Sequence, residues 1–136
     1  MLSTALRTIV TLMLILVSLI HLMPLIGVLG AEHLTSLYGL SLADPNILIL
    51  MRHRAILFGL LGVFFLIAAF RPRNQPMALV AGYMSVIGFL VLAYSGGDYN
   101  AALARVVQAD LIALGALVIA SICWLMLRFK PKDTEH

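Results

Sequence analysis

Apolar residues run through this chain in four long blocks. The blocks cover residues 9–29, 47–70, 77–94 and 106–129, and each is long enough, or nearly so, to cross a membrane. An α-helix rises about 1.5 Å per residue, so about 20 residues cross a hydrocarbon core of about 30 Å. A helix satisfies its own backbone hydrogen bonds in lipid, and the alternation typical of membrane β-strands is absent from the sequence. The pattern predicts an all-α membrane protein, a bundle of four transmembrane helices in a single domain.

Short polar segments separate the four blocks. Two prolines in residues 71–76 predict a tight antiparallel hairpin of the second and third helices, and residues 95–100 form a glycine-containing turn. The longest connection, residues 30–46, carries leucines and a tyrosine, which predict a partly helical piece on the membrane surface. Residues 130–136 are polar and are predicted to be a disordered tail.

Composition excludes a water-soluble domain. Of the 136 residues, 62% are hydrophobic and 11% are charged, whereas a soluble domain is about half apolar and about a quarter charged. A chain this short cannot bury so much apolar surface within itself. The formal net charge of +3 comes from scattered residues without a basic stripe, so we expect no nucleic-acid partner.

The distribution of Lys and Arg predicts the orientation of the bundle, because cytoplasmic flanks collect these residues. Six lie on the side of the two chain ends and three on the other side. The larger group comprises Arg7, Arg71, Arg73, Arg128, Lys130 and Lys132, and the smaller comprises Arg52, Arg54 and Arg105. We therefore expect both termini in the cytoplasm.

A cleaved signal peptide is the rival interpretation of the first block. Arg7 precedes the apolar run, and residues 28–31 resemble a cleavage site. The run is longer than the apolar stretch of about 7 to 15 residues in a signal peptide, so we expect a retained helix.

Small residues recur four positions apart within the predicted helices, a spacing that lets helix backbones approach closely in lipid. The pairs are Ala55 and Gly59, Ala78 and Gly82, Ala81 and Ser85, Ala109 and Ala113, and Ala116 and Ala120, and Gly62 and Gly88 add two further positions. The pattern predicts a compact bundle.

Charged and polar residues gather at the helix ends on the non-cytoplasmic side. This polar cluster comprises Glu32, His33, Arg52, His53, Arg54, Asp98, Arg105 and Asp110. Asp110 lies inside its helix, where an ionisable group needs a partner, and Arg52 or Arg54 is the natural one. Successive helical residues are about 100° apart, so Arg52, His53 and Arg54 cannot all face one partner. The cluster is either a ligand pocket for a polar headgroup or a structural ion-pair network that joins the second helix to the fourth.

His21 lies deep in the first helix, three residues before Pro24. We expect its ring to bond to a backbone carbonyl freed by the proline, with a ligand contact or a proton relay as the alternative. The histidines and the single cysteine lack metal-ligand spacing, so no metal site is predicted. Motifs for a catalytic nucleophile or a nucleotide-binding loop are missing too, so no catalytic residue or cofactor can be assigned.

Three segments resemble a family of small bacterial inner-membrane proteins, the DoxX-like four-helix group. They are EHLTSLYG at residues 32–39, MRHRAILFGLLG at residues 51–62 and AAFRP at residues 68–72. The resemblance covers most of the chain and implies a bacterial inner-membrane location. DoxX-like relatives are linked to quinone-coupled sulfur oxidation, which implies a quinone near Arg52, His53 and Asp110. Some relatives carry the label phosphopantetheine adenylyltransferase, but this chain lacks the His-x-Gly-His motif and the α/β fold of that enzyme, so we reject the activity.

Two functions follow from these observations. The first is a non-enzymatic membrane protein that binds a lipid or quinone, or assists a membrane complex or a second copy of itself. The second is a subunit of a quinone-coupled redox enzyme in which His53 or Asp110 handles protons. A transporter or channel is disfavoured, because the third helix has no ionisable residue to build a pathway across the membrane.

Overall fold

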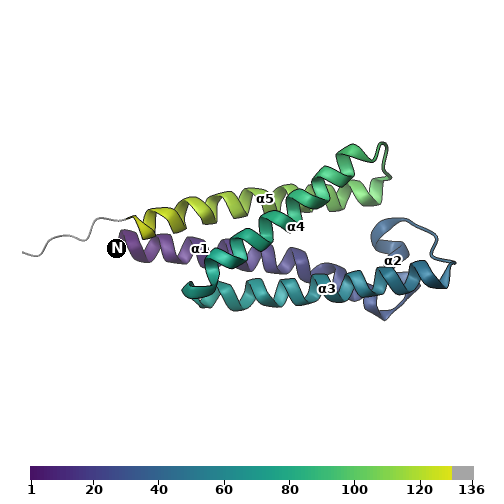
Figure 1. Ribbon diagram of the computed structural model, residues 1–136, viewed down its shortest axis with the longest axis horizontal. Helices are drawn as coiled ribbons and strands as arrows, with labels where there is room; N and C mark the ends of the chain where they lie inside the picture. The colour runs from purple at the N-terminus through teal and green to yellow at the C-terminus, as the bar shows by residue number, and fades with distance from the viewer. Residues whose placement is uncertain (130–136) are drawn as a thin grey trace, which may run out of the picture.

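The structure is a computed structural model that describes residues 1–129, and the predicted tail of residues 130–136 lies outside them. The elements are α1 (Leu2–Leu22), the 3₁₀ segment η1 (Met23–Leu29), α2 (Ala31–Tyr38), α3 (Pro45–Phe70), the 3₁₀ turn η2 (Pro72–Asn74), α4 (Gln75–Ser95) and α5 (Ala101–Arg128). Four helical stretches are long and apolar enough to cross a membrane: Leu2–Leu29, Pro45–Phe70, Pro72–Ser95 and Ala101–Arg128. The predicted class, an all-α bundle with four membrane-spanning helices, is therefore confirmed for the described chain (Figure 1).

Local capping explains why the helices extend beyond the apolar blocks. The Asp44 carboxylate accepts a hydrogen bond from the backbone N–H of Asn46 at 2.8 Å, so α3 begins at Pro45. The Asn100 side chain accepts a hydrogen bond from the N–H of Leu103 at 2.8 Å, so α5 begins at Ala101 and not near residue 106. Hydropathy identifies the part of a helix that lies in lipid. A cap extends the helix by turns that contain polar residues, and hydropathy does not predict these turns.

The first span changes from an α-helix to a 3₁₀ helix near a proline. α1 begins at Leu2 and ends at Leu22, and the chain continues as η1 to Leu29. Pro24 has no backbone N–H to donate, so the α-helical hydrogen-bond pattern cannot pass through it unchanged. The connection that follows contains α2, which ends at Gly39 in the left-handed conformation with a φ of 65°.

α1 is the central helix of the bundle. It packs along both α3 and α5, while α4 crosses the bundle to pack against α5 (Figure 1). The turn at η2 is tight, but α4 makes little contact with α3 beyond it. The predicted tight hairpin of the second and third spans is therefore wrong beyond the turn, because side-chain packing and not loop length chooses the neighbour of a helix.

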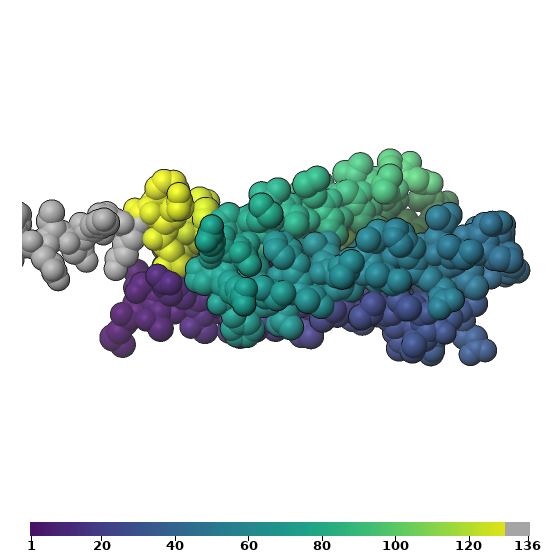
Figure 2. Space-filling view, turned by 60° about the horizontal axis from the view of Figure 1, so that its bottom comes forward, coloured from purple at the N-terminus to yellow at the C-terminus, as the bar shows by residue number. Residues whose placement is uncertain are grey.

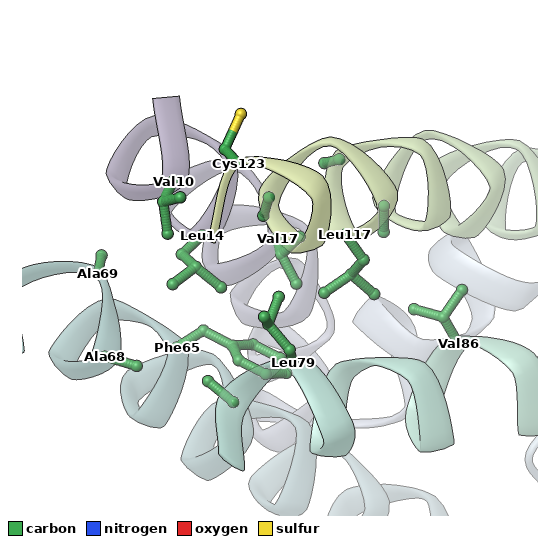
Figure 3. Packing of buried hydrophobic residues seen from close by; sticks show 14 of the residues in the cluster. Val10, Leu14, Val17, Phe65, Ala68, Ala69, Leu79, Val86, Leu117 and Cys123 are labelled. Atoms are coloured by element: carbon green, nitrogen blue, oxygen red, sulfur yellow. The ribbon is translucent and has the colours of Figure 1, made fainter. Parts of the chain in front are cut away.

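The core lies between α1, α3, α4 and α5. Figure 3 shows Val10, Leu14 and Val17 of α1 facing Phe65 of α3 and Leu117 of α5, and all five side chains are fully buried. Many large apolar side chains of the same helices are exposed, as expected where the surrounding solvent is lipid. The packing is thus that of a membrane bundle, with an apolar interior and an apolar exterior.

Close helix contacts occur at some of the predicted small residues. The Ser18 hydroxyl donates to the Gly62 carbonyl at 2.7 Å, and a Cβ on Gly62 would lie 3.1 Å from the backbone nitrogen of Leu22. Gly62 therefore sets the approach of α3 to α1. Gly88 has open space around it and is exposed, so the close approach predicted there is wrong.

Candidate functional site

A cavity of about 220 Å³ lies where η1 and α2 meet α3, α4 and α5. Its polar lining consists of His21, Ser36, Tyr38, Arg54, Arg105 and Asp110. Apolar walls come from Ile20, Met23, Pro24, Phe58, Phe89 and Val106, with smaller or shorter side chains between them. We refer to this space as the aromatic cavity. A concave apolar site with a few polar groups is the usual form of a small-molecule pocket.

Arg54 is the charged centre of the aromatic cavity. Its guanidinium carbon lies 5.2 Å from the ring centroid of Tyr38, 5.0 Å from that of Phe58 and 5.9 Å from that of Phe89. Three elements, α2, α3 and α4, thus supply the rings around one cation. Each such contact stabilises the cation by about 0.5 to 2 kcal/mol, the larger value applying away from water. Arg54 is half-buried, so its charge is held within the protein without being sealed off.

Among residues 1–129, Asp110 supplies the only carboxylate that lines this cavity. Its side chain is 7% exposed, and Arg54 lines the same space. The other partner considered for it, Arg52, turns away and donates its Nε–H to the carbonyl of Val28 at 2.9 Å. Arg54 therefore shares the cavity with Asp110, whereas Arg52 caps the end of η1.

Tyr38 closes the cavity from α2. Its side chain is 4% exposed, and burial raises the pKa of the hydroxyl above 10.0. The guanidinium of Arg54 opposes this shift and the Asp110 carboxylate adds to it. The phenol is therefore protonated at neutral pH and available as a hydrogen-bond donor.

His21 is buried at the inner end of the cavity, with 1% of its side chain exposed. Its Nδ1 lies 2.9 Å from the carbonyl oxygen of Val17 and its Nε2 lies 3.1 Å from the hydroxyl of Ser85. A carbonyl only accepts, so Nδ1 carries a proton, and in the neutral ring Nε2 then accepts from Ser85. The carbonyl freed by Pro24 belongs to Ile20, so the bond predicted from the proline is wrong. His21 instead joins α1 to α4.

The predicted polar cluster divides into two groups. Arg54, Arg105 and Asp110 line the aromatic cavity. The remaining members are exposed and do not line it: Glu32, His33, Arg52, His53 and Asp98. Helix geometry explains part of this division, because residues one position apart on a helix point about 100° away from each other.

Several cavity residues were not singled out from the sequence. In the sequence, Tyr38 belongs to the apolar surface segment, and Phe58 and Phe89 belong to the predicted spans. One signal was available: Arg54 and Phe58 are four residues apart, the spacing at which helical side chains contact each other. Phe89 and Tyr38 come from distant segments, and no local pattern indicates their approach.

Four apolar spans around a partly polar cavity define the chain as a multi-pass all-α membrane protein. No protein-family model, curated protein or solved structure matches it. Among residues 1–129, no three His, Cys, Asp or Glu side chains are grouped closely enough to hold a metal ion. The proposed function therefore rests on the geometry of the aromatic cavity.

Proposed function

We propose that this protein is a non-enzymatic protein of the bacterial inner membrane that binds one amphipathic molecule with a quinone-type ring in the aromatic cavity. One observation carries the proposal: Tyr38 and Arg54, each with a hydrogen-bond donor, line a small cavity together with Phe58, Phe89 and several aliphatic side chains. Aromatic walls suit a flat ring, and the two donors suit its carbonyl oxygens.

The size of the cavity supports a single-ring headgroup. A cavity of about 150 Å³ is enough to hold benzene, and pockets for drug-sized molecules begin at about 300 Å³. At about 220 Å³, the aromatic cavity has room for one substituted ring. A long apolar tail would remain outside it, in the lipid.

The charge of the cavity supports a neutral headgroup over a phosphate. Asp110 offsets one of the two arginines that line it. A phosphate placed beside Arg54 would also stand close to the Asp110 carboxylate, and like charges repel strongly away from water. A quinone carbonyl accepts hydrogen bonds without adding a full negative charge.

The alternative is a subunit of a quinone-coupled redox enzyme in a larger membrane complex. Asp110 and His21 both line the cavity, where they could exchange protons with a bound ring. His53, the other proton carrier expected from the sequence, is exposed and outside the cavity. This alternative requires an electron-donating partner protein, so co-purification of a redox subunit would favour it.

Filling the cavity should remove the ligand. Ala109 lines it from α5, and Ala109→Phe should place a ring where the ligand ring would lie. We expect mass spectrometry of molecules extracted from protein in mild detergent to find close to one quinone per chain, and almost none in this variant. Ala101→Phe, on the same helix but outside the cavity, is the matched control and should retain it. A wild-type protein that carries only bulk lipid would contradict the proposal.

Asp110→Asn separates a binding site from a structural network. A quinone site predicts that this variant loses bound quinone while its melting temperature changes little. A structural network predicts the opposite, a lower melting temperature with unchanged retention. Both quantities can be measured on the same detergent-purified sample.

We also propose that both termini face the cytoplasm, which the excess of Lys and Arg on their side supports. A fluorescent protein fused after residue 136 should therefore fluoresce, because it folds in the cytoplasm. Alkaline phosphatase fused at the same place should be inactive, because it needs the disulfides of an oxidising compartment. Active phosphatase with a dark fluorescent fusion would reverse the orientation.

A further inference from the structure

A second cavity lies at the opposite end of the bundle. It has a volume of about 710 Å³ and is lined by residues from the start of α1, the end of α3, the turn at η2, the start of α4 and the end of α5. Figure 2 shows the beginning of α1, the segment around η2 and the end of α5 together at this end of the molecule. Three of the lining residues are Arg7, Arg73 and Arg128. We call this space the basic cavity.

The charge of the basic cavity is of one sign. Three guanidinium groups from three separate elements line it, and the lining includes no Asp or Glu of the described chain. The acidic residues of that part of the chain are Glu32, Asp44, Asp98 and Asp110, which belong to the other end of the bundle. Unlike the aromatic cavity, this one offers an anion three positive charges, and no carboxylate of residues 1–129 lines it.

The start of α4 adds to this preference for an anion. Its N-cap residue, Asn74, makes no capping hydrogen bond through its side chain. The dipole of α4 places partial positive charge at this end of the helix, which favours an anion nearby. The backbone N–H of Gln75 already donates to the Pro72 carbonyl, and Pro76 has no N–H, so this contribution comes from the dipole and not from free backbone donors. Gln75 and Pro76, the first residues of α4, both line the basic cavity, and Gln75 is buried there.

The remaining walls are apolar and belong to the membrane boundary. Phe70 and Leu127 line the cavity, and Phe70 is exposed toward the surroundings of the bundle. Trp124 lies under Arg128, with the guanidinium carbon 5.8 Å from its ring centroid. Tryptophan and arginine are enriched where the hydrocarbon core meets the headgroups. A ligand held here would contact both positive charge and apolar side chains.

We propose that the basic cavity binds the headgroup phosphate of an anionic phospholipid, with the acyl chains lying against Phe70 and the neighbouring apolar surface. The proposal is independent of the ligand of the aromatic cavity, because the two cavities share no lining residue. It explains why three arginines on separate elements line one space to which residues 1–129 contribute no acidic side chain.

Arg73→Gln is the direct test, and Arg71→Gln is its matched control. Both remove one charge from an exposed arginine of the same turn, but only Arg73 lines the cavity. A basic residue near an anionic membrane surface contributes about 1 kcal/mol, which corresponds to about fivefold in affinity. We expect Arg73→Gln, and likewise Arg7→Gln, to weaken phosphatidylglycerol binding about fivefold in native mass spectrometry. Arg71→Gln should leave it unchanged.

Three outcomes would overturn the proposal. Equal losses in Arg71→Gln and Arg73→Gln would show a general effect of positive charge. Equal binding of phosphatidylcholine and phosphatidylglycerol would show that binding does not depend on the charge of the headgroup. Displacement of the lipid by millimolar inorganic phosphate would assign the cavity to the free anion. Circular dichroism of each variant checks that the helices are intact.

Discussion

Gly62→Leu should lower the free energy of unfolding by about 3 kcal/mol, one of the two largest stability effects we predict. The side chain would begin 2.7 Å from Cγ of Leu22 and 3.1 Å from its backbone nitrogen, so α1 and α3 would have to move apart. Separating them also breaks the hydrogen bond from Ser18 to the Gly62 carbonyl. Leucine favours the helix over glycine by about 1 kcal/mol, which offsets only part of the loss.

Gly88→Leu provides the matched control, since it makes the same change in another span. No atom lies within 4 Å of a Cβ placed there. We expect its melting temperature in detergent to equal or slightly exceed that of the wild type, because only the helix preference changes. Equal stability of both variants would mean that α1 and α3 do not pack through Gly62.

Arg54→Met should cost about 3 kcal/mol of unfolding free energy, because it removes the half-buried cation of the cavity and leaves Asp110 with only the exposed Arg105. The cation–π contacts with Tyr38, Phe58 and Phe89 are lost at the same time. Asp110→Leu should cost less, about 1 kcal/mol, since Arg54 is only half-buried and keeps its aromatic contacts.

Removing both charges should recover most of the loss. If Arg54 compensates Asp110, the double variant Arg54→Met with Asp110→Leu should be more stable than Arg54→Met alone by about 2 kcal/mol. Thermal unfolding of the four proteins in one detergent completes this double-mutant cycle. Additive effects, with no recovery in the double variant, would show that the two side chains do not interact.

The class of the protein was predictable because hydropathy is a local quantity. Each apolar block shows by itself that it belongs in lipid, and backbone hydrogen bonding in lipid then requires a helix. The start of α5 was harder to predict, since the cap at Asn100 adds turns that carry polar residues. The need of Asp110 for a cationic partner was also predictable, because an ionisable group within a span is costly when alone.

The tertiary structure determines which residues line the aromatic cavity. The choice of Arg54 over Arg52 depends on how α3 is rotated about its axis, and that rotation is set by packing of its small residues against α1. Tyr38 and Phe89 reach the same guanidinium from α2 and α4, which are far apart in sequence. The divergence of α4 from α3 follows from its packing against α5, which the length of the turn cannot specify.

The sequence by itself determined that the helices lie in lipid, how many spans there are and which kind of side chain needs a partner. The free energy of transfer from water to lipid is a sum over the residues of each segment, so each segment can be assessed alone. Only the tertiary structure decided which partners meet and where two cavities of different charge lie. Those outcomes depend on crossing angles and rotations of whole helices, and these are set by contacts between side chains that no single segment contains.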